Sequence, residues 1–169
     1  MMKVFRPFCA CLIGLVIVAT ETFPTFAQRA GVETKVASLL SRTCTGNHVQ
    51  KKIANVSIGR RLYPSRAYIN SGSASQPFLI VCKVNSKGSK KGFGTLRFTL
   101  GQQDNSTSVV LDVRFFLNGN LTSSYTFRSG ELRTLLLDVS RVEDVAIEVY
   151  NNGYSVPLYV LEDVLEPMN

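Results

Sequence analysis

The chain has 169 residues, of which 45% are hydrophobic, and 19 Lys and Arg against 12 Asp and Glu give a formal net charge of +7. This length suits one domain with a core of its own. No apolar stretch after the first 27 residues is long enough to cross a membrane, so we exclude a protein with several membrane spans.

The first 27 residues are predicted to be a secretory signal peptide. Lys3 and Arg6 precede an apolar stretch at 8–19, and small residues before position 28 place the cleavage site after Ala27. The alternative is an uncleaved membrane anchor, but a spanning helix needs about 20 apolar residues. We therefore expect a secreted or periplasmic chain that does not insert into the membrane once the signal is removed.

Two cysteines, Cys44 and Cys82, remain in the mature chain. In an oxidising compartment such a pair indicates one disulfide. That bond would close a long loop and stabilise the fold by about 3–4 kcal/mol on the chain-entropy estimate. Two buried free thiols are the alternative interpretation.

A short helix is expected at 32–40, where apolar residues have helical spacing, within an N-terminal extension at 28–52. From 53 to 169 the chain is predicted to be one β-rich domain. The candidate strands are 56–58, 67–70, 78–84, 94–100, 108–117, 124–127, 133–137, 145–150 and 157–165. Short strands separated by turn signals indicate an antiparallel sandwich or barrel, and Asn118-Gly119-Asn120 predicts a tight hairpin.

Residues 135–153 are predicted to form a strand, a polar corner, a second strand and a turn. The continuous apolar run at 135–137 suits a strand that is covered on both faces. Residues 145–150 alternate with period two, which is typical of a half-buried strand. Between the strands, Val139 and Val142 are expected to plug the corner.

Charge is distributed unevenly along the chain. Residues 34–103 carry twelve Lys and Arg and no acid, whereas residues 104–169 carry four basic and ten acidic residues. One interpretation is a basic face for an anionic polymer, and the other is that the two halves interleave and neutralise each other. The anionic-polymer site would use Arg60, Arg61, Lys83, Lys87, Lys90 and Lys91.

The sequence carries no recognisable catalytic motif, and its single histidine is His48. Neighbouring carboxylates such as Glu143 and Asp144 point to opposite faces of a strand, so they do not suit glycoside hydrolysis. We predict that the chain is not an enzyme and needs no cofactor. A structural calcium ion at Asp104 or Asn105 is the alternative considered.

Non-covalent sugar binding is the chemistry that the residues favour. Tyrosine rings stack on sugar rings, and Asn or Arg side chains hydrogen-bond to hydroxyl groups. The 151–154 loop combines Asn151 and Asn152 with Tyr154 and predicts the rim of such a site, with Arg128 as a further contact. The alternative for any one of these aromatics is a place in the core.

Residues 53–167 resemble a known family in the order and spacing of several short motifs. The matching positions are Ile58, Gly59, Tyr63 and Ile69, then Val113, Phe115, Leu117 and Gly119, then Leu136, Asp138, Val139, Ser140 and Val142, and finally Val145, Ile147 and Val149. The family is the carbohydrate-binding module first noted on family 98 glycoside hydrolases (NPCBM). Arg141 stands where the family usually has Gly, and the closing Trp-bearing segment is replaced by one with Tyr159.

The resemblance implies a galactose-binding-like, jelly-roll β-sandwich that presents a ligand surface at one end. The chain would then be a non-catalytic module that binds glycan or cell-envelope polysaccharide weakly and has no nucleic-acid partner. Two alternatives stay open. One is a periplasmic or cell-surface adaptor that binds a protein partner or a second copy of itself, and the other is the anionic-polymer binder.

Overall fold

The computed structural model describes residues 36–46, 49–51, 53–88, 92–105 and 109–168. The chain divides into two compact units, 1–32 and 33–169, and every described residue belongs to the second. The predicted signal peptide therefore lies outside the described residues, as do His48, Lys90 and Lys91. Within the described ranges no helix is long and apolar enough to cross a membrane.

Strands make up almost all of the regular structure. In chain order the elements are β1 (Ala37–Ser38), the 3₁₀ helix η1 (Leu39–Ser41), β2 (Cys44–Thr45), β3 (Val49–Gln50), β4 (Ala54–Ile58), β5 (Arg61–Ser65), β6 (Ala67–Asn70), β7 (Gly72–Ser73), β8 (Phe78–Lys83), β9 (Phe93–Gly101), β10 (Leu111–Leu117), β11 (Asn120–Phe127), β12 (Leu132–Asp138), β13 (Asp144–Asn151) and β14 (Pro157–Pro167).

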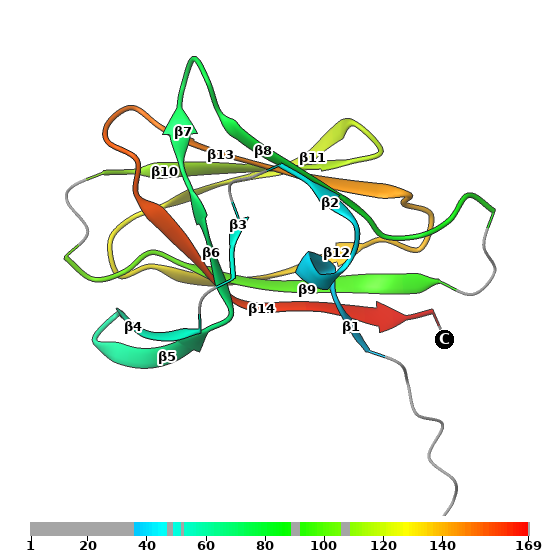
Figure 1. Cartoon of the computed structure of the whole chain (residues 1–169), viewed down its shortest axis with the longest axis horizontal. Coiled ribbons are helices and arrows are strands. Elements are labelled where there is room, and N and C mark those ends of the chain that lie inside the picture. The colour runs from blue at the N-terminus through cyan, green and yellow to red at the C-terminus, as the bar shows by residue number, and fades with distance from the viewer. Residues whose placement is uncertain (1–35, 47–48, 52, 89–91, 106–108, 169) are drawn as a thin grey trace, which may run out of the picture. The chain divides into compact units, whose positions relative to one another are not determined.

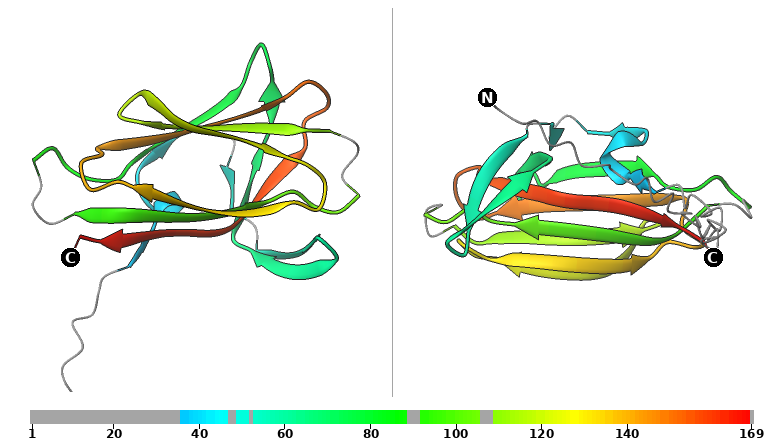
Figure 2. Two further views of the ribbon diagram at one scale, coloured as in Figure 1. Left: turned by 180° about the vertical axis from the view of Figure 1, so that it is seen from behind. Right: turned by 90° about the horizontal axis from the view of Figure 1, so that it is seen from below.

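Apart from the separate two-stranded β4–β5 hairpin, the strands form two sheets that pack face to face. Sheet A has the order β12-β9-β14-β6-β3, with β1 beside β14, and sheet B has the order β11-β10-β13-β8-β2, with β7 beside β13. Strands β10, β11 and β13 lie above β9 and β14 in Figure 1, and Figure 2 shows both layers from behind and from below. The predicted all-β, antiparallel sandwich is thus confirmed.

The core lies between the sheets because every second residue of the central strands points inward. In β13 the inward set is Val145, Ile147 and Val149, all fully buried. Phe98 of β9 and Phe115 of β10 meet edge to face across the core, with ring centroids 5.9 Å apart. This contact joins sheet A to sheet B at the centre of the sandwich.

The 135–153 stretch folds as strand, corner and strand, with one difference from the expectation. Leu135 and Leu137 are buried, but the Leu136 residue is 69% exposed, so the prediction of a strand covered on both faces is wrong. The reason is that β12 is an edge strand of sheet A with its outer face in water. Val139 and Val142 are buried in the corner, as predicted.

The N-terminal segment is part of the sandwich. Residues 32–35 of the helix expected at 32–40 lie outside the described residues, and the described part forms β1 and a single 3₁₀ turn. The Ser38 side chain caps that turn by accepting from the Ser41 N–H. Strands β1, β2 and β3, which the sequence placed in an extension, pair with β14, β8 and β6. The predicted Cys44–Cys82 disulfide is present and joins β2 to β8.

Candidate functional site

One end of the sandwich gathers the loops that precede β10, β12 and β14. Leu111 at the start of β10 pairs with Asn151 on one side and with Phe127 on the other, and Leu132 pairs with Gly101. The tip of the β4–β5 hairpin also reaches this end, which is on the left in Figure 1. We call this set of loops the loop end.

Asn151 holds the β13–β14 loop in place from inside. The residue is 1% exposed, and its side-chain amide donates to Ser71 Oγ and to the backbone carbonyl of Tyr154 at 2.9 Å. Its Oδ1 accepts the Gly153 N–H at 2.6 Å, while Ser71 Oγ also accepts the Val156 N–H at 3.0 Å. Because these bonds occupy both ends of the amide, Asn151 is a scaffold residue of the loop.

Tyr154 and Asn152 are displayed on that loop. Tyr154 is 85% exposed, so its ring is open to solvent, and Asn152 is exposed beside it. A large aromatic ring left in water on a hydrogen-bonded loop offers a ready stacking surface for a planar or ring-shaped ligand. The sequence names this loop as a candidate rim but gives no sign of Ser71, which lies 80 residues before Asn151 and meets it only through the fold.

A second group of polar residues at the loop end surrounds Asp104. Its carboxylate accepts the hydroxyl of Ser57 at 2.6 Å and the backbone N–H groups of Gly59 and Arg60 at 2.9 Å each. The Ser57 hydrogen bond and then the Arg60 N–H hold the pKa of Asp104 below its ordinary value of 3.8. A cavity of about 480 Å³ opens here, lined by Ser57, Arg60, Gln103, Asp104, Asn105 and Ser129.

Arg128 lies on the Asp104 side of the loop end. Its backbone N–H donates to Glu131 Oε2 at 3.0 Å. In the same turn the Gly130 N–H donates to the backbone carbonyl of Gln102. The Gln102 amide in turn donates to the carbonyl of Val109 at 3.0 Å. The loop end therefore has an aromatic side at Tyr154 and a charged side at Arg128.

The surroundings of Asp104 do not favour a cation. A bound calcium ion needs oxygen atoms that are free to coordinate it. Both Asp104 oxygens instead accept N–H and O–H donors. Among the residues that the structure describes, no group of three His, Cys, Asp or Glu is arranged to hold a metal.

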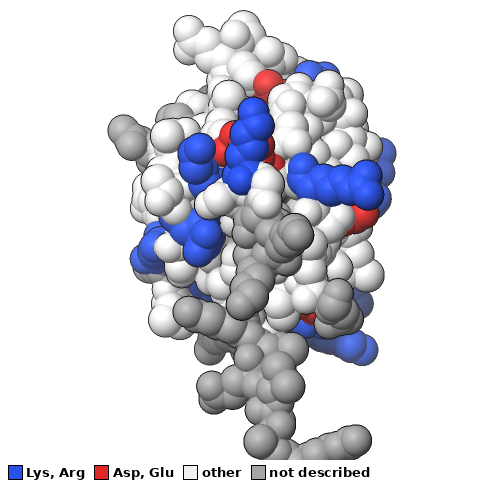
Figure 3. Space-filling model, turned by 90° about the vertical axis from the view of Figure 1, so that its right-hand side faces the viewer, with Lys and Arg blue, Asp and Glu red and all other residues white. Residues whose placement is uncertain are grey.

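The four described residues of the predicted anionic-polymer site do not lie together. Arg60 and Arg61 belong to the β4–β5 hairpin at the loop end. Lys83 lies opposite Asp144 in the β8–β13 ladder, at the other end of the sandwich, and Lys87 follows it in the chain. Lys and Arg outnumber Asp and Glu on the face seen in Figure 3, but acidic residues lie among them.

Ion pairs also connect the basic and the acidic half of the sequence. Arg97 pairs with Glu162 at 3.3 Å and with Glu166 at 3.0 Å across neighbouring strands of sheet A. Arg66 and Asp163 form a further pair of this kind at 3.6 Å. These contacts favour the interpretation that the two halves neutralise each other.

The outer face of sheet B carries an apolar groove of about 370 Å³, whose lining includes Leu79, Val81, Phe116 and Ala146. We call it the outer groove. Leu79 is 47% exposed. Beside the groove, Arg114 lies over the Tyr150 ring at 4.8 Å from its centroid.

Comparisons with known proteins identify the fold. No family model and no curated protein matches the chain. A solved structure of CBM51 from Clostridium perfringens GH95 in complex with methyl-galactose is similar with a TM-score of 0.57 and 9% identity, over 77% of this chain and 99% of that one. The CBM51-2 and INT domains of Clostridium perfringens ZmpB give a TM-score of 0.55 and 14% identity over 78% of this chain.

The chain spans 31% of the length of that ZmpB structure, which was also solved with GlcNAc bound to CBM51-2. At these identities the similarity establishes the fold alone, which this chain shares with the two CBM51 structures. Carbohydrate binding and the assignment to the family 98 type both stay predictions.

Proposed function

We propose that the chain is an exported, non-catalytic carbohydrate-binding module that binds glycan or cell-envelope polysaccharide weakly at the loop end. The observation that carries this proposal is the exposed Tyr154 ring on a loop that Asn151 and Ser71 hold by hydrogen bonds. Because the loop backbone is already held, little backbone conformational entropy is lost when a ligand stacks on the ring that it carries. Similarity to modules solved with methyl-galactose and GlcNAc supports the proposal.

In this proposal each predicted rim residue has a distinct role. Tyr154 stacks on a sugar ring, and the exposed Asn152 and Arg128 side chains hydrogen-bond to hydroxyl groups. Asn151 acts through the loop that it holds. The site is open to water, which accounts for weak binding at a single site, and the Cys44–Cys82 disulfide is consistent with an exported protein.

Affinity electrophoresis through gels that contain neutral or acidic polysaccharides, at low and high salt, tests the proposal. We expect retardation on a neutral polysaccharide that persists at high salt and is lost in Tyr154→Ala. Leu121→Ala is the matched control, since it also removes an exposed apolar side chain, 58% exposed, but near the Asn118-Gly119 turn at the other end of β10 and β11. Equal retardation of wild type and Tyr154→Ala would refute the loop-end site.

A protein-binding adaptor is the second candidate function, and the outer groove favours it. Leu79 and Phe116 form part of an apolar surface on a sheet face that no other element covers in the described structure. Exposed apolar patches of this kind mark protein contact sites. Absence of retardation on every polysaccharide, together with oligomers that Leu79→Asp dissociates in sedimentation velocity, would favour the adaptor.

A further inference from the structure

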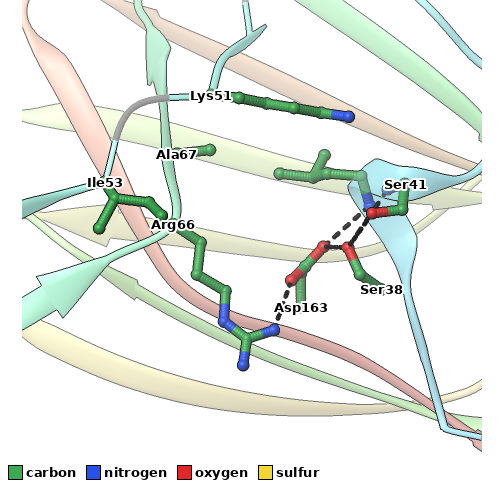
Figure 4. A pocket seen from close by; sticks show the side chains of 8 residues that line it. Ser38, Ser41, Lys51, Ile53, Arg66, Ala67 and Asp163 are labelled. Carbon is green, nitrogen blue, oxygen red and sulfur yellow. Dashed lines mark hydrogen bonds and ion pairs between the residues drawn. The ribbon is translucent and has the colours of Figure 1, made fainter.

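A separate pocket lies on the side of the sandwich, where the N-terminal segment crosses β6 and β14. Its volume is about 460 Å³, and we call it the side pocket. The polar and rim residues that line it are Ser38, Ser41, Lys51, Ile53, Arg66 and Asp163. Figure 4 shows Lys51 above the pocket and the Arg66–Asp163 pair below it.

Asp163 is the buried acid of the side pocket, with 1% of the residue exposed. Its Oδ2 accepts the Ser38 hydroxyl and the Leu40 N–H, the latter at 2.9 Å, and thereby fixes the η1 turn. Among the described residues its Oδ1 has no hydrogen-bond donor, and it forms an ion pair with Arg66 Nη1 at 3.6 Å. A buried carboxylate oxygen without a donor is costly, so this atom can accept an O–H or N–H group from a ligand.

The positive charges of the side pocket exceed the negative charge. Arg66 faces Asp163, but its side chain is 59% exposed, so the guanidinium can turn toward a ligand and uncover Oδ1. Lys51 is exposed and has no acidic partner among the described residues. Two cations beside one carboxylate favour a ligand that carries its own negative charge.

The remaining wall of the side pocket is apolar. Leu40 and Ala67 are buried beneath it, and Ile53 stands at the rim with 88% of its surface exposed. Such a wall suits the carbon skeleton of a small molecule, and the volume of about 460 Å³ lies within the usual range for small-molecule sites. A bare inorganic anion would leave this surface unused.

We infer that the side pocket binds a hydroxy acid of the size of one sugar, that is, the acidic sugar unit of a polysaccharide. The carboxylate pairs with Lys51 and Arg66, a ligand hydroxyl donates to Asp163 Oδ1, and the ring lies against Leu40 and Ile53. The choice of a sugar acid among hydroxy acids rests on the proposed carbohydrate-binding function.

NMR titration of the chain with galacturonate tests this inference. In wild type we expect chemical-shift changes of side-pocket resonances that saturate as galacturonate is added. Lys51→Gln and Arg66→Gln should each bind galacturonate about tenfold more weakly, since each variant removes one charge-assisted contact. Both residues are exposed, so these variants are expected to fold. Arg66→Lys keeps the charge but loses the paired N–H donors of the guanidinium. Its affinity for galacturonate should therefore lie between those of wild type and Arg66→Gln.

The comparison ligands separate the possible outcomes. Methyl galactoside and the methyl ester of galacturonate lack the charge, and neither should shift side-pocket resonances at concentrations that suffice for galacturonate. Equal binding of the ester would overturn the role of the two cations. Equal competition by acetate would show that any carboxylate suffices and would overturn the role assigned to the hydroxyl group and the apolar wall.

Tyr154→Ala distinguishes failure of this inference from failure of the loop-end proposal. Galacturonate affinity should be unchanged in Tyr154→Ala, and retardation on neutral polysaccharide should be unchanged in Lys51→Gln. Asp163→Asn should weaken galacturonate binding, and its circular dichroism spectrum must match wild type for that loss to count. If galacturonate shifts only loop-end resonances, the side-pocket site is wrong.

Discussion

Asn151 and Asn152 are adjacent in the sequence, yet their side chains lie in opposite environments. Asn151 is 1% exposed and its amide is used by Ser71, Gly153 and Tyr154, whereas Asn152 is exposed. Residue type alone assigned both to the ligand rim. The difference arises because Asn151 ends β13 with its side chain on the inner face of the strand, and Asn152 begins the loop.

The lowered pKa of Asp104 makes the stability of the fold depend on pH. The Ser57 hydroxyl, and then the backbone N–H groups of Arg60 and Gly59, hold its pKa below 3.8 in the folded chain. A folded-state pKa below the unfolded value stabilises the fold above the unfolded pKa, and this contribution is lost as the pH falls through the folded pKa. The free energy of unfolding of Asp104→Asn should therefore fall less steeply than that of wild type as the pH drops below 3.8.

Urea denaturation at several pH values measures this difference. Glu131 and Asp138 also have lowered pKa values, but both residues are present in wild type and in Asp104→Asn, so their effect cancels when the two proteins are compared. Ser57→Ala is the matched variant, since it removes the largest cause of the shift, and its slope should lie between the other two. Parallel pH profiles for wild type and Asp104→Asn would contradict the prediction.

At the scale of elements, period-two alternation predicted the long strands well. The ladder of β13 with β10 and β8 follows from inward residues such as Ile147, and the Asn118-Gly119 turn joins β10 to β11 as expected. Alternation cannot tell an edge strand from a central one, so Leu136 was wrongly expected to be covered. That distinction depends on sheet order, which is set by contacts far apart in the sequence.

Short strands were missed for a different reason. Strands β1, β2, β3 and β7 have two residues each, too few to show any period. Strand β5 contains Pro64, which normally argues against a central strand, but β5 forms a separate two-stranded hairpin with β4. Tertiary pairing, and not local pattern, makes these segments extended.

The Cys44–Cys82 disulfide fixes one of these short strands and gives a prediction at this scale. It closes a loop with a sequence separation of 38 and holds β2 at the edge of sheet B. The double variant Cys44→Ala/Cys82→Ala should lose about 3–4 kcal/mol of unfolding free energy because its unfolded chain is less constrained. Guanidinium denaturation measures the loss, and a reductant should destabilise wild type but leave the double variant unchanged.

At the scale of the whole molecule, the two candidate sites differ in how far the sequence predicts them. The loop-end rim could be predicted because Asn152 and Tyr154 belong to one short loop. The side pocket could not, because Asp163 meets Ser38 and Leu40 across more than 120 residues of sequence. Glu162 and Asp163 are adjacent in the sequence, yet a bulge in β14 lies beside Glu162, which pairs with Arg97, while Asp163 is buried.

The aromatic contact between the sheets leads us to expect that the sandwich unfolds as a single cooperative unit. Phe115 is fully buried and meets Phe98 across the core at 5.9 Å and Tyr125 at 6.2 Å. Removal of a large buried ring loses its burial and leaves a cavity, so Phe115→Ala should cost about 3–5 kcal/mol of unfolding free energy. Leu136→Ala is the matched control, and it should change stability by about 0.5 kcal/mol or less because this residue is 69% exposed.

Urea denaturation followed by both tyrosine fluorescence and circular dichroism measures these two variants. The rest of the buried core still joins the two sheets, so the two probes should report one shared transition in Phe115→Ala, moved to lower urea. Two separate transitions would mean that the sheets unfold independently once the contact is gone. A cost for Phe115→Ala no larger than that for Leu136→Ala would contradict the packing of sheet A on sheet B through this ring.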